Sequence, residues 1–135
     1  MISTERKLLV GAPGALLGVF ISMHPLFQAL LALQAIDFAT GFLVAWSNGV
    51  ISSDASRKGF VKKAIALLLV IAVKVLTTAY QVDIGIDLAA SVSGWFCLTE
   101  VISIAENAAR AGWTLPTFLL KALAAMKDQA EGGRK

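Results

Sequence analysis

Three charged side chains occur inside long apolar runs of this sequence: Asp37, Lys74 and Glu100. Two carboxyl groups can in principle work as an acid–base pair. No nucleophile–histidine set accompanies them, because His24 is the only histidine and Cys97 the only cysteine. The sequence also has no glycine-rich phosphate loop and no Cys/His ligand cluster. We therefore expect no catalytic residue, no cofactor and no metal site.

The surroundings of these charges point to a membrane. A charge at the centre of a spanning helix costs about 2.5–3.5 kcal/mol on insertion scales, so the three side chains should face a helix bundle, a water path or an opposite charge. Lys74 is expected either to pair with Asp37 or Glu100 or to extend its ammonium group toward the interface. Two interpretations stay open. The charges only hold helices together, or they line a hydrated path or keep an assembly closed until it is triggered.

Small and polar residues share a helical face with each carboxylate. Thr40 and Gly41 follow Asp37 at helical spacing. The corresponding residues around Glu100 are Ser93, Ser103 and Asn107. Polar stripes on apolar helices indicate helix–helix contact or a wet lumen. The sequence therefore predicts that both faces pack against other helices or line water.

The composition favours a membrane protein as well. Of the 135 residues, 57% are hydrophobic and 16% are charged, and the mean hydropathy is +0.75. Soluble domains are typically about 45–50% apolar and about 25% charged. The net charge is +3, but the basic residues flank the apolar runs and form no stripe with interleaved aromatic residues. This pattern argues against a nucleic-acid partner.

The apolar blocks predict an all-α integral membrane protein with a single domain, residues 1–135. A spanning helix needs about 20 apolar residues, with a range of about 17–25. The expected spans are 8–23, 26–46, 61–80 and 88–109. The first of these is short, so three spans are the alternative to four. Thr114 as N-cap and Pro116 in the first turn begin an amphipathic helix over 114–128, which we expect on the membrane surface or on a partner chain.

The basic residues set the expected orientation. In a four-span arrangement, eleven of the twelve Lys and Arg residues lie on one side. They occupy the N-terminal segment, the C-terminal tail, and a turn between the second and third spans that holds Arg57, Lys58, Lys62 and Lys63. Cytoplasmic segments are enriched in Lys and Arg. The basic turn and both termini are therefore expected in the cytoplasm.

Two blocks of the sequence carry a resemblance to a known family. The first, starting at Asp37, is DFATGFLVAWSNGVISSDASRKGFVKK, which has an acid, a small-residue stripe, a Ser-Ser pair and a glycine followed by basic residues. The second, starting at Thr99, is TEVISIAENAARAGWTLPTFLLKAL, which carries polar residues, then a glycine and a proline, then an amphipathic tail. In order and spacing, over roughly residues 37–123, the chain resembles the holins of phage lysis and toxin secretion, including the clostridial toxin-release holins.

This resemblance implies a function. Such bacteriophage-type holins accumulate in the bacterial inner membrane, form homo-oligomers in the lipid bilayer and open pores or lesions at a set time. A cytoplasmic endolysin or a toxin then crosses, and host cell lysis follows. The resemblance implies no enzyme activity, and it implies an antiholin as a further partner. From the residues alone, two other functions stay open: a small four-helix multidrug-type exporter with an intramembrane carboxylate, and a structural membrane anchor subunit.

Overall fold

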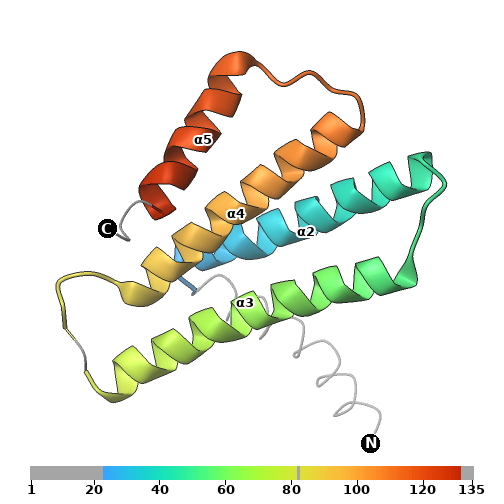
Figure 1. Cartoon of the computed structure of the whole chain (residues 1–135). Coiled ribbons are helices and arrows are strands. Elements are labelled where there is room, and N and C mark those ends of the chain that lie inside the picture. The colour runs from blue at the N-terminus through green and yellow to red at the C-terminus, as the bar shows by residue number, and fades with distance from the viewer. Residues whose placement is uncertain (1–22, 82, 132–135) are drawn as a thin grey trace, which may run out of the picture.

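The computed structural model describes residues 23–81 and 83–131, and within these residues it contains helices and no strand. The helices are α2 (Pro25–Ser47), α3 (Ser53–Ala79), α4 (Leu88–Arg110) and α5 (Thr117–Glu131) (Figure 1). The predicted all-α class is confirmed for this part of the chain. The predicted span over 8–23 lies outside the described residues, except for Met23.

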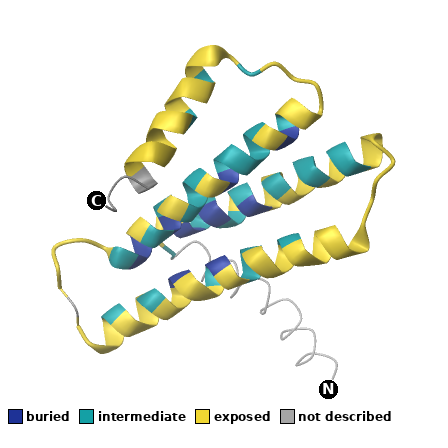
Figure 2. Cartoon of the chain, in the orientation of Figure 1, coloured by how far each residue is buried: buried dark blue, intermediate teal, exposed yellow. Residues whose placement is uncertain are grey.

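Three helices surround a small apolar core. The most extensive contact joins α2 and α4, α3 packs against α4, and α5 folds back along α4 (Figure 1). Leu30 of α2 is fully buried, and Phe27, also on α2, and Val70 of α3 complete the buried cluster. Figure 2 shows the buried residues on the facing sides of α2, α3 and α4 and the exposed residues around the outside. The core therefore lies at the seam where the three helices meet.

The outward faces of these helices are rich in large apolar side chains. On α2 they include Phe38, Phe42 and Leu43, and on α3 they include Leu68, Val75 and Leu76, each exposed by about half or more. Soluble monomers rarely expose continuous apolar surfaces of this kind. In a bilayer such faces contact lipid, while the backbone polar groups are satisfied within each helix.

Glycine ends two of the helices in the same way. Gly49 has a positive φ of +67°, and the amide of Val50 donates to the carbonyl of Ala45 at 2.9 Å across the end of α2. Gly112, with φ +86°, ends α4 in the same conformation. A residue without Cβ adopts this left-handed conformation at little steric cost. These turns fix where the chain leaves the apolar bundle at the basic end.

The start of α3 corrects the sequence prediction. The Ser52 hydroxyl accepts a hydrogen bond from the amide of Ala55 at 3.3 Å, and Asp54 lies in the first turn. Both features stabilise a helix N-terminus. The helix therefore begins in the segment predicted as a polar loop, and the four residues of the predicted basic turn all lie on α3: Arg57, Lys58, Lys62 and Lys63.

By length and composition, α2 and α4 are the helices of the described residues that can cross a membrane. Each agrees with a predicted span, 26–46 and 88–109, to within one residue at either end. The 27-residue helix α3 contains the predicted span 61–80 up to Ala79, but charged residues occupy its first half. The longer α3 thus consists of a charged first part and an apolar second part.

The C-terminal helix begins slightly later than the range 114–128 predicted for it. The carbonyl of Pro116 accepts from the amides of Leu119 and Leu120 at 3.0 and 3.2 Å, so Pro116 precedes the first turn of α5. Leu123 lines a shallow groove between α5 and α4, whereas Phe118 is 73% exposed. One side of α5 therefore faces the bundle and leaves other apolar side chains uncovered.

Candidate functional site

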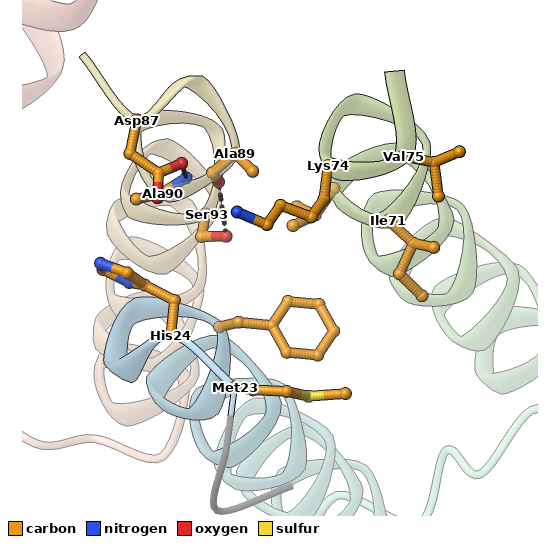
Figure 3. Close-up of a pocket in the computed structure, with 11 residues that line it drawn as sticks. Met23, His24, Ile71, Lys74, Val75, Asp87, Ala89, Ala90 and Ser93 are labelled. Carbon is orange, nitrogen blue, oxygen red and sulfur yellow. Dashed lines mark hydrogen bonds between the residues drawn. The ribbon is translucent and has the colours of Figure 1, made fainter. Parts of the chain in front are cut away.

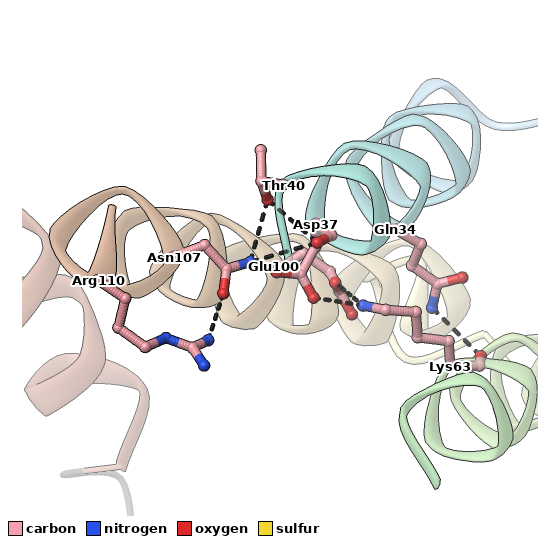
Figure 4. Close-up of polar contacts among 7 residues, drawn as sticks. All are labelled: Gln34, Asp37, Thr40, Lys63, Glu100, Asn107 and Arg110. Atoms are coloured by element: carbon pink, nitrogen blue, oxygen red, sulfur yellow. Dashed lines mark hydrogen bonds and ion pairs between the residues drawn. The ribbon is translucent and has the colours of Figure 1, made fainter. Parts of the chain in front are cut away.

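A largely buried ion cluster joins three helices near the middle of α2 and α4. Lys63 of α3 places its Nζ 2.7 Å from Oδ2 of Asp37 on α2 and forms a second ion pair with Oε2 of Glu100 on α4 (Figure 4). The exposed fractions of the side chains are 16% for Lys63, 12% for Asp37 and 11% for Glu100. One cation therefore connects two carboxylates and three helices.

A buried amide extends this cluster. Asn107 of α4 is 2% exposed, and its Nδ2 donates to Oδ1 of Asp37 at 2.8 Å and to the hydroxyl of Thr40 at 3.0 Å. Arg110 in turn donates to Oδ1 of Asn107 (Figure 4). A Cβ added to Gly41 would lie 3.5 Å from Nδ2 of Asn107, so a side chain larger than alanine there would push the amide away. The small residue on α2 permits the close approach of α4.

A second polar link joins α2 to α3. Gln34 is 6% exposed, and its Nε2 donates to the backbone carbonyl of Lys63 at 3.2 Å. Gln34 precedes Asp37 by three residues and so shares its helical face. Lys63 is therefore held against α2 by its backbone as well as by its side chain.

The charges of the cluster balance. Asp37 and Glu100 are opposed by Lys63, in contact, and by Arg110, through the Asn107 amide. An isolated charge inside a membrane is unfavourable, whereas paired charges that face the bundle interior are tolerated. Removing one partner of a buried pair is far more disruptive than replacing all of them. The arrangement can therefore hold one packing of the helices, and neither carboxylate is left free to bind a cation from outside.

A cavity of about 410 Å³ opens beside the cluster, at the end of the bundle that carries the basic residues. Asp37, Lys63 and Arg110 supply its charged lining. Much of the remaining wall consists of small residues on α2 and α3: Gly41, Ala45, Ala55, Ser56 and Gly59. The cavity gives water a route from the basic end to the ion cluster. Within the described residues no group of His, Cys, Asp or Glu side chains could hold a metal ion.

The structure brings together two of the three charges singled out from the sequence. Asp37 and Glu100 share one cation, but that cation is Lys63 and not Lys74. Lys74 lines a different cavity together with His24 and Asp87. Of the two alternatives for Lys74, the pairing with Asp37 or Glu100 is therefore wrong, and the extension of its ammonium group toward the interface stays a prediction. Because α3 begins at Ser53, Lys63 lies roughly 15 Å from the start of the helix. At this position it is level with Asp37 and Glu100, which lie near the middle of α2 and α4.

The predicted polar stripes meet only in part. Thr40, Gly41 and Asn107 come together beside Asp37, and Ser103 lines the same cavity. Ser93 is buried at the other end of α4, where its hydroxyl donates to the carbonyl of Ala89 in its own helix at 2.8 Å.

The other predicted basic residues stay on the surface. Arg57 pairs with Asp54 at 3.0 Å, with side chains 75% and 77% exposed, and an exposed pair of this kind contributes little to stability. Lys58 and Lys62 are exposed as well.

Sequence reasoning missed three members of the site: the ion-pairing role of Lys63, and Gln34 and Arg110. Two signals were available for them. Gln34 lies one turn before Asp37 in an otherwise apolar run, and the Ser52 cap with Asp54 marks an early start of α3. No signal in the sequence identifies Arg110 as the partner of Asn107.

Replacing Asn107 by leucine should lower the free energy of unfolding by about 1–2 kcal/mol, because Asp37, Thr40 and Arg110 all lose a hydrogen-bond partner. Reversible unfolding in mixed detergent micelles measures this change. The matched control is Thr99→Val, since Thr99 is exposed on the same helix and its hydroxyl bonds only within α4, to Trp95. Equal stability of the two variants would contradict a structural role for the amide.

Comparison with known proteins adds to this geometry. The sequence model of the bacteriophage holin family matches residues 14–128. The protein BH0965 of Halalkalibacterium halodurans is 30% identical over 76% of this chain and 78% of its own length. A probable holin of Bacillus phage phi105 is 30% identical over 67% of this chain and 65% of its own length. The protein YqxH of Bacillus subtilis is 28% identical over 76% of this chain and 71% of its own length. No solved structure matches the chain.

Proposed function

Since the chain belongs to the bacteriophage holin family, a non-enzymatic family that permeabilises membranes, we propose that it forms homo-oligomers in the bacterial inner membrane and opens lesions at a timed point. A cytoplasmic endolysin then reaches the cell wall, and host lysis follows; a secreted toxin is the alternative cargo, and an antiholin is a further partner. The observation that carries the proposal is the family match over residues 14–128, combined with a buried ion cluster between apolar helices.

The proposed membrane topology has four spans, with the segment 8–23 preceding α2, α3 and α4. The apolar outward faces of α2 and α3 support insertion. Basic residues are concentrated near the start of α3 and the end of α4, which supports a cytoplasmic position for this end of the bundle. Both termini would then be cytoplasmic. The helix α5, with Phe118 and Met126 exposed, would lie on the cytoplasmic surface of the membrane with its apolar side chains in the interface.

The ion cluster is the proposed element that keeps the protein closed. With Lys63 between Asp37 and Glu100, the charged groups are turned away from lipid and hold α3 against α2 and α4. A neutral, hydrogen-bonded set of charges favours one arrangement of the helices over others. Separation of α3 from its neighbours exposes these charges, which then require water or a second copy of the chain. The 410 Å³ cavity beside the cluster supplies a route for that water.

The test is induced expression of the whole chain in bacteria. We expect a sudden loss of membrane potential, followed by release of an endolysin that lacks its own export signal. Cells that carry an empty vector control for induction. Cells that keep their membrane potential while the chain accumulates to high levels in the membrane would contradict the proposal. Resistance to lipophilic cations without loss of potential would instead favour an exporter, although Lys63 occupies both candidate carboxylates.

A further inference from the structure

A second cavity lies at the end of the bundle opposite the basic residues. It has a volume of about 490 Å³ and is lined by α2, α3 and α4 together with the residues that precede α2 and α4 (Figure 3). Phe27, Val70, Ile71 and Val75 form its apolar wall. Cavities of about 300–1,000 Å³ with apolar walls and a few polar groups are typical of small-molecule sites. The ion cluster of the proposed function makes no use of this cavity.

Lys74 directs its ammonium group into this cavity (Figure 3). Among the described residues its side chain has no hydrogen-bond or ion-pair partner, whereas Lys63 has two carboxylates. Lys74 lies five residues before Ala79, the last residue of α3, a distance of about 7.5 Å along the helix. In the proposed topology this depth is where lysine side chains reach the lipid headgroups.

His24, which precedes α2, adds a second donor to the lining of the cavity, from a different element than Lys74 (Figure 3). Its Nδ1 accepts a hydrogen bond from the amide of Leu26 at 3.2 Å and caps α2. In the neutral imidazole, a nitrogen that accepts carries no proton, so the proton is on Nε2. Nε2–H is then a donor available to a ligand. Lys74 and His24 together supply the kind of donors that a phosphate group accepts.

Asp87 supplies the opposite charge. It caps α4, with Oδ1 accepting from the amide of Ala90 at 2.9 Å, and it is exposed at the mouth of the cavity (Figure 3). The amide of Ala90 is the main cause that holds the pKa of the Asp87 carboxyl below its ordinary value, and Lys74 and His24 lower this pKa further. The carboxylate is therefore ionised at neutral pH. The lining of the cavity thus combines two hydrogen-bond donors suited to an anion, Lys74 and His24, with one negative charge, Asp87.

We propose that this cavity binds a phospholipid with a zwitterionic phosphoethanolamine headgroup. Lys74 and His24 contact the phosphate, Asp87 accepts from the ammonium group, and an acyl chain lies along Phe27 and Val70. An anionic headgroup has no ammonium group to pair with the carboxylate of Asp87, so the two negative charges would repel each other and weaken binding. A water-soluble phosphate ester would leave the apolar wall uncovered. The two charges and the apolar wall together therefore favour this class of lipid over both.

The test measures lipid binding by the full chain, purified in mild detergent, with native mass spectrometry. Wild-type protein is titrated with phosphatidylethanolamine or phosphatidylglycerol of the same acyl chains. We expect a preference for phosphatidylethanolamine of about tenfold, the scale of one charge-assisted contact. Lys74→Gln should weaken binding of phosphatidylethanolamine by a similar factor. Asp87→Asn keeps a side chain that caps helices well and should remove the preference between headgroups.

Lys62→Gln is the matched control, because Lys62 is an exposed lysine in the first half of the same helix, about three turns away from Lys74. Unchanged binding in Lys74→Gln, or a loss as large in Lys62→Gln, would overturn the proposal. Equal affinity of the wild type for both lipids would overturn the assignment of the headgroup. Glycerophosphoethanolamine that binds as tightly as the lipid would overturn a lipid ligand. The inference rests on the proposed membrane insertion but not on permeabilisation, so it can fail while loss of membrane potential is still observed, and the reverse.

Discussion

Replacing Lys63 by methionine is expected to bring lysis forward. Methionine has a similar length and no charge, so Asp37 and Glu100 both lose the cation between them. Breaking a buried ion pair by removing one partner typically destabilises by about 3–5 kcal/mol. This destabilisation applies to the closed state, in which α2, α3 and α4 are packed together. It does not apply to the open state, because there the carboxylates are exposed to water and need no lysine as a partner. The balance between closed and open states therefore shifts toward opening.

Two measurements check this result: the time from induction to loss of membrane potential, and the free energy of unfolding in mixed micelles. The control is Lys62→Met, which removes a positive charge from the neighbouring position of α3. Lys62 is exposed, so this variant should lyse close to the wild-type time. If Lys63→Met and Lys62→Met behave alike at equal membrane levels, the ion cluster has no part in timing.

The choice of Lys63 over Lys74 shows where sequence reasoning succeeds and where it stops. The ranges of α2 and α4 follow from hydropathy together with local signals such as Pro25 and Gly49, because these act within one helix. Which side chains meet across helices depends on the rotation and offset of each helix. Neither quantity is encoded in a hydropathy profile. The sequence prediction treated Lys63 as part of a basic turn at the edge of the span 61–80, whereas α3 already begins at Ser53, and this difference was enough to miss its position inside the bundle.

The stripes of small and polar residues gave better guidance to the site than the charges did. Thr40, Gly41 and Asn107 were predicted to lie on helix-contacting faces, and they do meet beside Asp37. This worked because the helical period fixes which residues share a face. Arg110 could not be recognised in this way, since its guanidinium reaches Asn107 from the exposed end of α4. Its contact depends on side-chain conformation and not on the helical period.

A fully neutral cluster is expected to have the opposite effect on lysis from the single replacement. The variant combines Asp37→Asn, Lys63→Met and Glu100→Gln, which removes every charge of the ion pairs and keeps the approximate side-chain sizes. Replacing a complete buried ion set is often neutral or stabilising, by up to about 4 kcal/mol. The closed arrangement should therefore survive, and the free energy of unfolding should equal or exceed that of the wild type.

Opening of the neutral variant, in contrast, should be less favourable, because the variant lacks the charged groups that water stabilises in the open state. In the wild type, separation of α3 exposes two carboxylates and an ammonium group, which are stabilised by a hydrated lesion and strongly disfavoured in contact with lipid. Without these charges, the open state gains less from water while the closed state is at least as stable. Lysis should be delayed or absent at wild-type membrane levels, with the time to loss of potential as the measurement.

The two variants together separate a switch from simple helix packing. If the ion pairs only hold helices together, the neutral variant with restored stability should lyse at the wild-type time, and Lys63→Met should differ from it in stability alone. If the pairs set the balance between closed and open states, the timing should move in opposite directions: earlier with two unpaired carboxylates, later with none. A neutral variant that lyses as early as Lys63→Met would contradict both alternatives, because it would tie early opening to the loss of the lysine itself.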